Sequence, residues 1–513
     1  MLKRNLIANY LGQGWTALMG LAFIPLYIKY LGIEAYGLIG IFALLQSWLQ
    51  LLDMGMTPTL SREMARTIAG ANSAQSIRNL LRSIEIISLG MACIIAVGIW
   101  TASVWLASDW LRAEKLPVAK VAQAFTLMGI VTALRFIEGI YRSSIIGLQR
   151  QVLLNALSSV LATLRGLGAV GILIWVSPTL EAFFIWQGLI SILTVGILGI
   201  ATYLALPKTT SRGHFTLTAL VSVWRYAGGI LGITLLSLLL MQVDKIVLSK
   251  LLSLSDYGYY TLAVVVAGGI NIIGAPINQA WFPRLSELVA REDQTSLIKV
   301  YHQGAQLVSV VMGSAALVLI VFAETILQLW TQDSELAHRA APLVSVLVLG
   351  NLLNGLMWIP YQTQLAHGWT GLAIRINIIS IFIVVPAILW ATPHYGALGA
   401  AWIWAGLNAS YVLIGIHFMY RKIMIGEKWS WYTNDILSPL LGAGLAILLV
   451  KWLASTNLRP IGQLSALILA TIVAVLASTL TATLLRQQIY LFIKQVRPSF
   501  LKRKSNIQLN SGN

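Results

Sequence analysis

The chain has 513 residues, of which 58% are hydrophobic and only 10% are charged, and its net charge is +17. Soluble domains carry about 25% charged residues, so a soluble core could not bury this much apolar surface. The composition excludes an ordinary soluble fold and indicates a protein whose apolar surface faces lipid. The 42 glycines allow close helix packing, and the 18 tryptophans favour the membrane interface.

The predicted elements begin with residues 5–28, an uncharged stretch that follows Lys3 and Arg4. It is too long for the core of a signal peptide, so we interpret it as a membrane-spanning helix. About 20 apolar residues cross ~30 Å of hydrocarbon, and on this basis the sequence predicts an all-α integral membrane protein. Fourteen spans are expected, at 5–28, 35–56, 84–108, 119–146, 152–176, 181–206, 219–243, 257–281, 302–330, 340–366, 369–392, 396–420, 434–453 and 461–485.

Lysine and arginine are unevenly distributed between the loops on the two sides of the membrane. Twenty-one lie on the side of the N-terminus and nine on the opposite side. Because positively charged loops stay in the cytoplasm, we expect both termini to be cytoplasmic. The net charge is therefore a topology signal, and it predicts no nucleic-acid partner. The basic tail is expected either to lie along the anionic inner leaflet or to be solvated.

A short internal repeat indicates how the spans are organised. Lys29-Tyr-Leu followed by Tyr36-Gly37 recurs 221 residues later as Lys250-Leu-Leu followed by Tyr257-Gly258. Six spans separate the copies, so both have the same orientation, which predicts two parallel-repeat six-helix lobes plus two extra C-terminal helices. The expected boundaries are 1–213 for the N-terminal lobe, 214–425 for the C-terminal lobe, 426–485 for the two additional helices and 486–513 for the basic tail.

Arginines inside the apolar stretches are the strongest functional signal. Arg135, Arg165 and Arg375 lie within predicted spans, where a cation at the centre costs about 2.5–3.5 kcal/mol. Such residues usually face a water-filled path or a partner inside the helix bundle. Because the buried charge is mostly positive, it predicts a path for an anionic substrate.

Span 119–146 contains three of the charged residues on one face. Arg135, Glu138 and Arg142 are spaced i, i+3, i+7. A local Arg135–Glu138 ion pair is the simple alternative, but it leaves a surplus positive charge unexplained. We expect Glu138 to orient Arg135. For Arg375, snorkelling to the interface explains the position equally well. The predicted cationic lumen comprises Arg135, Arg165, Arg375, Arg142 and Glu138.

Polar residues in other spans allow two interpretations each. Asn5, Asn9 and Gln13 form a stripe at i, i+4, i+8 that can bind either sugar hydroxyls or neighbouring helices. Asp53 and Asp244 lie at span ends, where a solvated helix end or an interface residue is the simple interpretation. Both are kept as candidates for ion coupling. Cysteine and histidine do not cluster at the spacing of metal ligands, so no metal site is expected.

Several short motifs occur in a defined order. They are Pro25-Leu-Tyr27, Leu31-Gly32 with Tyr36-Gly37, Leu52-Asp-Met-Gly55, Gly147-Leu-Gln-Arg150, and Val243-Asp-Lys245 before Tyr257-Gly258. Each is weak alone, but their order and spacing resemble the polysaccharide transport family. These are the O-antigen-type flippases of the multidrug, oligosaccharidyl-lipid and polysaccharide exporter superfamily.

The resemblance implies a flippase with two lobes that open alternately to each side of the membrane. Its substrate would be an undecaprenyl-diphosphate-linked oligosaccharide, moved from the inner to the outer leaflet of the bacterial cytoplasmic (inner) membrane. Polysaccharide polymerase machinery is an implied partner, and no cofactor is expected. Whether a proton gradient, a sodium gradient or neither drives transport stays open. The alternatives are a multidrug or cation antiporter of the same fold and a membrane enzyme acting on lipid-linked glycans, although no loop offers a catalytic constellation.

Overall fold

The computed structural model describes residues 2–53, 56–68, 73–207, 213–217, 241–369, 371–453, 460–488 and 490, without the side chains of 2–8, 49–51 and 279. Within these ranges the chain is helical and forms no strand, apart from one isolated bridge between Arg112 and Ser253. The prediction of an all-α membrane protein is confirmed.

Contacts within the chain divide it into two compact units. Unit 1 comprises Met1–Thr261 with Ile388–Ala397, and unit 2 comprises Leu262–Ala387 with Leu398–Asn513. Residues 218–240 lie outside the described part of the chain, so the expected lobe boundary at 213 and the span 219–243 stay predictions.

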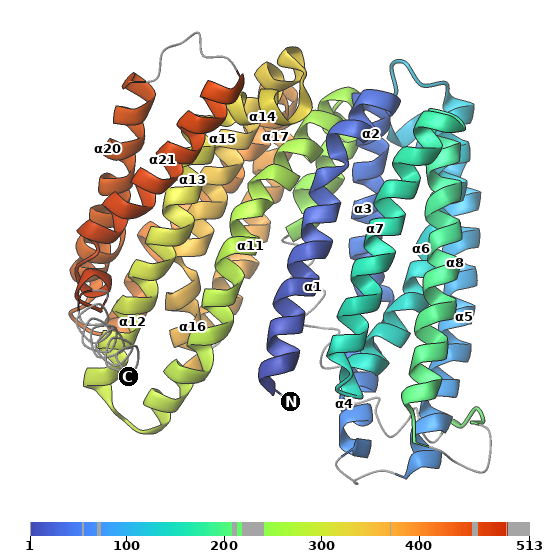
Figure 1. Cartoon of the computed structure of the whole chain (residues 1–513), viewed down its shortest axis with the longest axis horizontal. Coiled ribbons are helices and arrows are strands. Elements are labelled where there is room, and N and C mark those ends of the chain that lie inside the picture. Colours follow the sequence, from blue (N-terminus) through green and yellow to red (C-terminus); the bar gives the residue numbers. More distant parts are fainter. Residues whose placement is uncertain are drawn as a thin grey trace, which may run out of the picture. The chain divides into compact units, whose positions relative to one another are not determined.

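Unit 1 is built around a group of long helices. In Figure 1, α5 to α8 run side by side, and α1 packs along α7. The helices up to residue 205 are α1 (Leu2–Ala22), α2 (Ile24–Leu31), α3 (Ile33–Leu52), α4 (Met56–Ile68), α5 (Ala74–Trp105), the π-helical η1 (Leu106–Trp110), α6 (Val118–Gly147), α7 (Gln151–Trp175) and α8 (Leu180–Ala205). Residues 241–251 are also helical.

Local sequence determines several helix ends in unit 1. Ser73 caps α5 by accepting a hydrogen bond from the backbone N–H of Ser76 at 3.1 Å. Pro25 lies in the first turn of α2, where its missing N–H is tolerated. The chain therefore breaks at Phe23, and the apolar stretch predicted as a single span at 5–28 consists of two consecutive helices.

Apart from Ile388–Ala397, which belong to unit 1, unit 2 contains the end of α11 (Leu254–Ala290) and the helices that follow it. These are α12 (Gln294–Val308), η2 (Ser309–Gly313), α13 (Ser314–Val321), α14 (Ala323–Thr331), α15 (Ser334–Leu356), α16 (Trp358–Ala366), α17 (Gly371–Ser410), η3 (Tyr411–Gly415), α18 (Ile416–Lys422), α19 (Lys428–Ser430), η4 (Trp431–Leu437), α20 (Ser438–Leu453) and α21 (Pro460–Thr481). The paired helices α20 and α21, seen together in Figure 1, correspond to the two extra helices expected from the sequence.

Eleven helices in the described part of the chain are long and apolar enough to cross a membrane. One of them, Gly371–Lys422, covers the two predicted spans 369–392 and 396–420. The helical backbone is interrupted between them at Gly396, which adopts φ 60° and ψ −150°. The segment Ile33–Trp48 is apolar but shorter. The chain is a multi-pass membrane protein, and the total of fourteen spans stays a prediction.

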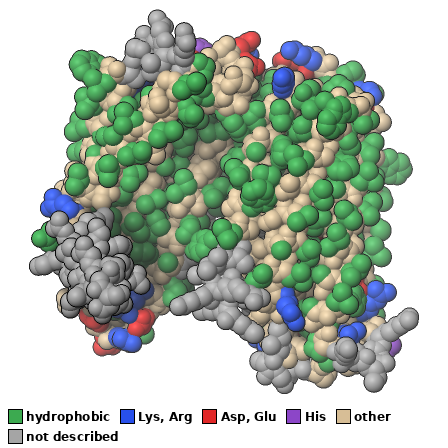
Figure 2. Space-filling model, in the orientation of Figure 1, with side chains coloured by type: hydrophobic (Ala, Val, Ile, Leu, Met, Phe, Trp, Pro, Cys, Tyr) green, Lys and Arg blue, Asp and Glu red, His purple; other side chains and the backbone are tan. Residues whose placement is uncertain are grey.

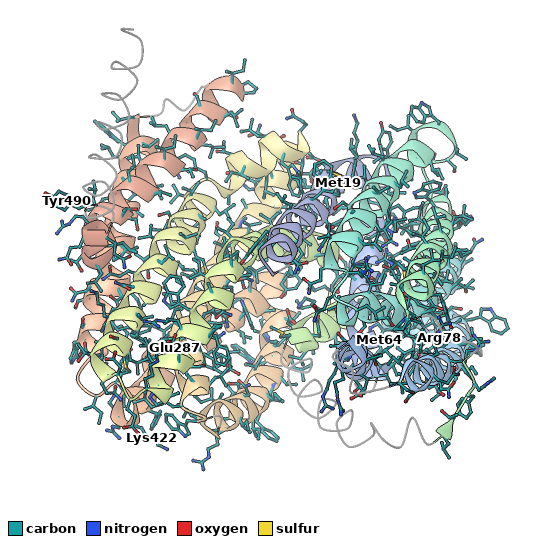
Figure 3. All side chains as sticks on the ribbon, turned by 60° about the horizontal axis from the view of Figure 1, so that its bottom comes forward. Met19, Met64, Arg78, Glu287, Lys422 and Tyr490 are labelled. Carbon is teal, nitrogen blue, oxygen red and sulfur yellow. The ribbon has the colours of Figure 1, made fainter. Side chains whose placement is uncertain are left out.

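The side chains on the helix surfaces fit a lipid environment. On the face of unit 1 seen in Figure 2, apolar side chains cover the helices, and lysines and arginines gather toward the helix ends. Trp175 and Leu204 are 84% and 82% exposed, which is favourable only against lipid or another apolar surface. Figure 3 turns one end of the unit forward, where Met64 is buried and Arg78 donates to the backbone oxygen of Pro207 at 3.0 Å.

The two copies of the sequence repeat pack against each other. A Cβ added to Gly37 would lie 2.5 Å from the backbone oxygen of Leu254, and one added to Gly258 would lie 2.4 Å from that of Ile33. The contact is reciprocal and preserves the offset of 221 residues, as a pseudo-two-fold axis requires. This is the arrangement expected of parallel repeats.

Alanine at either glycine should therefore destabilise the protein. Gly37→Ala and Gly258→Ala each place a methyl group against backbone, so we expect a loss of about 1–3 kcal/mol from overpacking. Gly268→Ala is the matched control in the same helix as Gly258, because a Cβ there meets nothing within 4 Å. Thermal unfolding of the purified variants measures the difference. Equal melting temperatures for Gly258→Ala and Gly268→Ala would contradict the close helix crossing.

Candidate functional site

Unit 1 contains a cavity of about 420 Å³ among helices α1, α2, α3, α6, α7 and α8. Three arginines contribute to its wall, together with neutral polar and aromatic side chains. The lining residues are Thr16, Met19, Gly20, Tyr27, Ile39, Phe42, Ala43, Gln46, Arg135, Arg142, Ser158, Leu161, Ala162, Arg165, Gly166, Phe183, Gln187 and Thr194. The structure thus brings Arg135, Arg142 and Arg165 together, although the third comes from a different span.

Arg135 reaches the cavity from α6 and is held by neutral groups. Its guanidinium donates to the side-chain oxygen of Gln46 from α3 and, at 3.1 Å, to that of Gln187 from α8. The guanidinium carbon lies 5.0 Å from the centre of the Phe42 ring, within the range of a cation–π contact. Because both acceptors are uncharged, they fix the orientation of Arg135 without neutralising it.

The carboxylate of Glu138 is buried and forms ion pairs with Arg142 and Arg165. Nε of Arg142 lies 2.7 Å from its Oε1, and a terminal nitrogen of Arg165 lies 3.6 Å from its Oε2. Arg142 also donates to Oγ of Ser158 at 3.0 Å. The prediction that Glu138 orients Arg135 is therefore wrong. Arg142 follows Glu138 by four residues on one helix face and reaches it directly, whereas Arg135 turns toward α3 and α8.

The cavity wall carries a surplus of positive charge. Three guanidinium groups and one carboxylate leave two net positive charges. Nε of Arg135 and Nε of Arg165 are buried and have no hydrogen-bond partner among the described residues. A guanidinium has five N–H donors in a fixed fork that matches phosphate and carboxylate oxygens. The wall is therefore equipped to bind an anion.

Several cavity residues were not predicted from the sequence. Gln187 is the only amide in the predicted span 181–206, and Gln46 shares the span 35–56 with Gln50; an amide inside an apolar stretch is the sequence signal that could have identified them. Tyr27 and Phe183 form an aromatic part of the wall, with ring centres 5.1 Å apart and planes at 73°. Aromatic residues in apolar spans are common lipid or core residues, so their sequence positions indicate no cavity.

Asn9 and Gln13 of the predicted sugar-contacting stripe on α1 do not line the cavity. Asn9 donates to Gln151 at 2.7 Å and accepts from Asn155 at 2.6 Å, which is the helix-to-helix interpretation of this residue. Gln13 is exposed, and the side chain of Asn5 lies outside the described part of the chain. The α1 residues that do reach the cavity come later, from Thr16 to Gly20.

The two ion-coupling candidates have local partners. Both carboxylate oxygens of Asp53 accept from the backbone N–H of Thr57, at 3.1 and 3.0 Å, which caps the start of α4. Asp244 lies 3.4 Å from Lys245 and accepts from the hydroxyl of Tyr260 at 2.7 Å. Their role in coupling stays a prediction.

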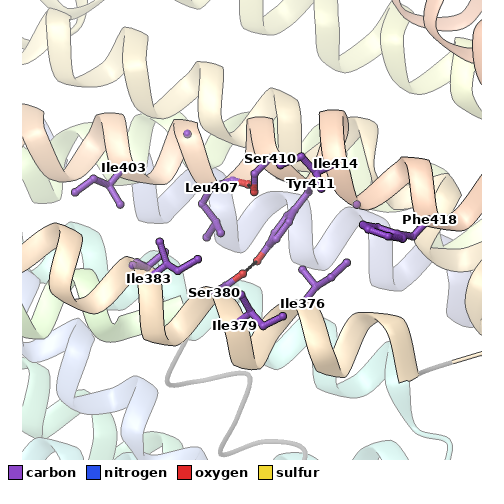
Figure 4. Close-up of a pocket in the computed structure, with 13 residues that line it drawn as sticks. Ile376, Ile379, Ser380, Ile383, Ile403, Leu407, Ser410, Tyr411, Ile414 and Phe418 are labelled. Atoms are coloured by element: carbon purple, nitrogen blue, oxygen red, sulfur yellow. Dashed lines mark hydrogen bonds between the residues drawn. The ribbon is translucent and has the colours of Figure 1, made fainter.

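Arg375 lies on α17 in unit 2, where it is exposed. The neighbouring apolar cavity of about 440 Å³ does not include it. Figure 4 shows this cavity, in which the hydroxyl of Tyr411 donates to Ser380 at 3.1 Å amid isoleucine, leucine and phenylalanine side chains. No charged residue lines it, so it is unsuited to an anionic group. Among the described residues, no cluster of three or more histidine, cysteine or acidic side chains could hold a metal.

Sequence comparisons match most of the chain to known proteins. The family model described as polysaccharide biosynthesis protein matches residues 2–289, and the MatE family model matches residues 230–390. A Shigella flexneri protein that carries the name O-antigen transporter is 21% identical over 407 residues, which cover 78% of this chain and 94% of that protein. A Salmonella typhimurium protein with the same name is 23% identical over 207 residues, or 40% of this chain and 45% of that protein.

Solved structures with a similar fold are membrane transporters. The lipid II flippase MurJ in an inward closed conformation has a TM-score of 0.66 at 12% identity, covering 93% of this chain and 98% of its own. An inward-facing multidrug resistance transporter of the MATE family has a TM-score of 0.66 at 14% identity, covering 80% of this chain and 94% of its own. At these identities the likeness establishes the shared fold.

Proposed function

Because the chain belongs to the polysaccharide biosynthesis protein family, we propose that it is a flippase for an anionic lipid-linked oligosaccharide. The substrate is an undecaprenyl-diphosphate-linked oligosaccharide that moves from the inner to the outer leaflet during surface polysaccharide synthesis. The relative named as an O-antigen transporter and the fold shared with a lipid II flippase support this proposal.

The positive cavity of unit 1 is the observation that carries the proposal. A diphosphate with attached sugars cannot cross ~30 Å of hydrocarbon unaided, because its hydration would be lost. Arg135, Arg142 and Arg165 replace part of that hydration with charge-assisted hydrogen bonds. The cavity contains two more positive charges than negative ones, so it favours a diphosphate or an acidic sugar over a neutral or cationic cargo.

The cavity residues have separable roles in this mechanism. Arg135 and Arg165, each with an unpartnered buried Nε, bind phosphate or acidic-sugar oxygens. Gln46 and Gln187 hold the guanidinium of Arg135 in place, and Glu138 holds Arg142 and Arg165. The polyprenyl chain stays in lipid while the head group is enclosed. Alternate opening of the two lobes then exposes the head group to the other side.

A drug or cation antiporter is the alternative function, because a multidrug transporter of the MATE family has a similar fold. A cavity for cationic drugs needs surplus negative charge, whereas Glu138 is the only carboxylate in contact with the described cavity arginines. The sign of the cavity charge therefore favours the flippase. A glycan-joining membrane enzyme has no supporting observation in the described residues.

The proposal includes a setting in the cell. We place the protein in the bacterial cytoplasmic (inner) membrane with both termini in the cytoplasm, on the distribution of lysine and arginine between its loops. The polymerase machinery that consumes the flipped substrate is its proposed partner. A proton or sodium gradient is its proposed energy source.

Deletion of the gene tests the proposed function. We expect a polyprenyl-diphosphate-linked oligosaccharide to accumulate in the membrane and the surface polysaccharide to be lost, with both effects reversed by a plasmid copy. Mass spectrometry of extracted lipids, alongside analysis of the surface glycan, provides the measurement. An unchanged surface and lipid pool, with new sensitivity to cationic drugs, would instead establish the antiporter.

A further inference from the structure

Unit 2 holds a cluster of titratable side chains that the proposed transport cycle does not use. His302 lies on α12, Asp435 lies on the π-helical segment η4, and Glu427 lies in the turn before α19. His302 is 6% exposed and Asp435 is fully buried, whereas the side chain of Glu427 is 28% exposed. The three residues bring together segments that are more than a hundred positions apart in the sequence.

Both nitrogens of the His302 ring face carboxylate oxygens. Nδ1 is hydrogen-bonded to Oδ2 of Asp435, and Nε2 lies 3.0 Å from Oε2 of Glu427. The other oxygen of Asp435, Oδ1, accepts from the side-chain amide of Gln306 at 3.0 Å. Asp435 therefore accepts hydrogen bonds through both oxygens, as an ionised carboxylate does.

The contacts of the His302 ring require one more proton than a neutral imidazole carries. A neutral imidazole has one N–H and one bare nitrogen. With its N–H given to Asp435, the bare Nε2 would present a lone pair to the Glu427 carboxylate, which is repulsive. One additional proton between Nε2 and Oε2 removes the conflict, and it resides on the ring because imidazole is a stronger base than a carboxylate.

We infer that His302, Asp435 and Glu427 form a proton-binding site in which a doubly protonated ring joins the two carboxylates. The inference goes beyond the proposed transport function and does not depend on it. Among the described residues, the charged groups acting on the ring are Asp435 and Glu427. The nearby phenols are Tyr301 on the same helix, Tyr420 on α18 and Tyr432 on η4, whereas α16 contributes apolar packing such as Ile359 beside Gly304.

The bound proton fastens the turn before α19 to α12 through the His302–Glu427 contact, whereas other contacts of α12 do not depend on it. Gln306, the neighbour of His302 one turn along α12, accepts from the backbone N–H of Leu484 at 3.0 Å just after α21. Tyr301 and Tyr420 add a hydroxyl contact at 2.6 Å. These contacts are neutral and persist when the proton leaves. The Glu427 contact depends on the proton, so the turn before α19 is the part released as pH rises.

A charge-neutral replacement of Glu427 tests the inference. In Glu427→Gln, the new amide donates to the bare Nε2 of a neutral ring, so the contact no longer requires a proton. We expect the melting temperature of wild type to fall, relative to Glu427→Gln measured in parallel, as the pH rises through and above the ordinary titration range of imidazole. The protonated site stabilises the fold at low pH, and this contribution disappears as the ring loses its proton. Glu292→Gln, an exposed change in the same unit, is the matched control and should behave as wild type.

A spectroscopic measurement decides the question independently of folding stability. The chain has six histidines, so a full-length variant with the other five replaced by glutamine reports on His302 alone. We expect ¹⁵N NMR of its imidazole to show both ring nitrogens protonated near neutral pH. A single protonated nitrogen, or identical pH dependence of melting in wild type and Glu427→Gln, would overturn the inference.

Discussion

Arg135→Glu is expected to abolish export of the surface polysaccharide while full-length protein remains in the membrane. The substitution changes the charge of the cavity wall from two net positive charges to none. At an effective dielectric constant of about 20, one charge 5 Å from an anion contributes about 3 kcal/mol. That energy corresponds to roughly a hundredfold in binding, and reversal of the charge turns the attraction into repulsion. Surface-glycan analysis of a deletion strain carrying the variant provides the measurement.

The control for this reversal is an arginine outside the cavity. Arg112 is exposed and lies in a loop on the predicted outer side, so Arg112→Glu leaves the cytoplasmic positive charge unchanged. It should export normally. Arg165→Glu should fail in the same way as Arg135→Glu, because Arg165 lines the same cavity. Full export by both cavity variants would remove the cationic cavity from the mechanism.

Glu138→Gln is expected to reduce the amount of folded protein sharply. Glu138 is 5% exposed and is the carboxylate to which Arg142 and Arg165 bind. Removing one partner of a buried ion pair leaves uncompensated charge and costs about 3–5 kcal/mol. Glu335→Gln is the matched control, because that side chain is 74% exposed in its pair with Arg339. Thermal unfolding of purified protein and membrane yield provide the measurement.

A double variant separates charge balance from a general packing defect. Glu138→Gln combined with Arg142→Gln restores the original two net positive charges, so stability should recover in part relative to Glu138→Gln. If the destabilising effects of Glu138→Gln and Arg142→Gln simply add in the double variant, charge compensation is not the role of Glu138.

The cavity residues that could be predicted from the sequence are those whose burial costs a large free energy. Arg135 and Arg165 stand out because a cation inside an apolar span needs a compensating environment. Gln46 and Gln187 do not, since an amide in a span costs less and serves equally well at helix contacts, as Asn9 does. The helices follow from apolar length, whereas the break at Phe23 was not predicted, although Pro25 explains it.

Partners that are far apart in the sequence were the part that could not be predicted. Arg135 and Gln46 are 89 residues apart, and His302 and Asp435 are 133 residues apart. Local spacing suggested a pair between Arg135 and Glu138, but packing against α3 and α8 offered Arg135 other acceptors. The reciprocal contact of Gly37 and Gly258 is the exception, because an internal repeat carries long-range information within the sequence itself.

Reconstitution in liposomes tests whether this chain moves a lipid-linked oligosaccharide between leaflets. Liposomes would contain purified protein and the polyprenyl-diphosphate-linked oligosaccharide extracted from the deletion strain, with an enzyme added outside that modifies the exposed glycan. Wild-type protein is expected to make the lipid of both leaflets accessible, whereas Arg135→Glu should leave the inner-leaflet share protected. Protection in wild-type liposomes equal to that in protein-free liposomes would show that the chain is not a flippase for this lipid.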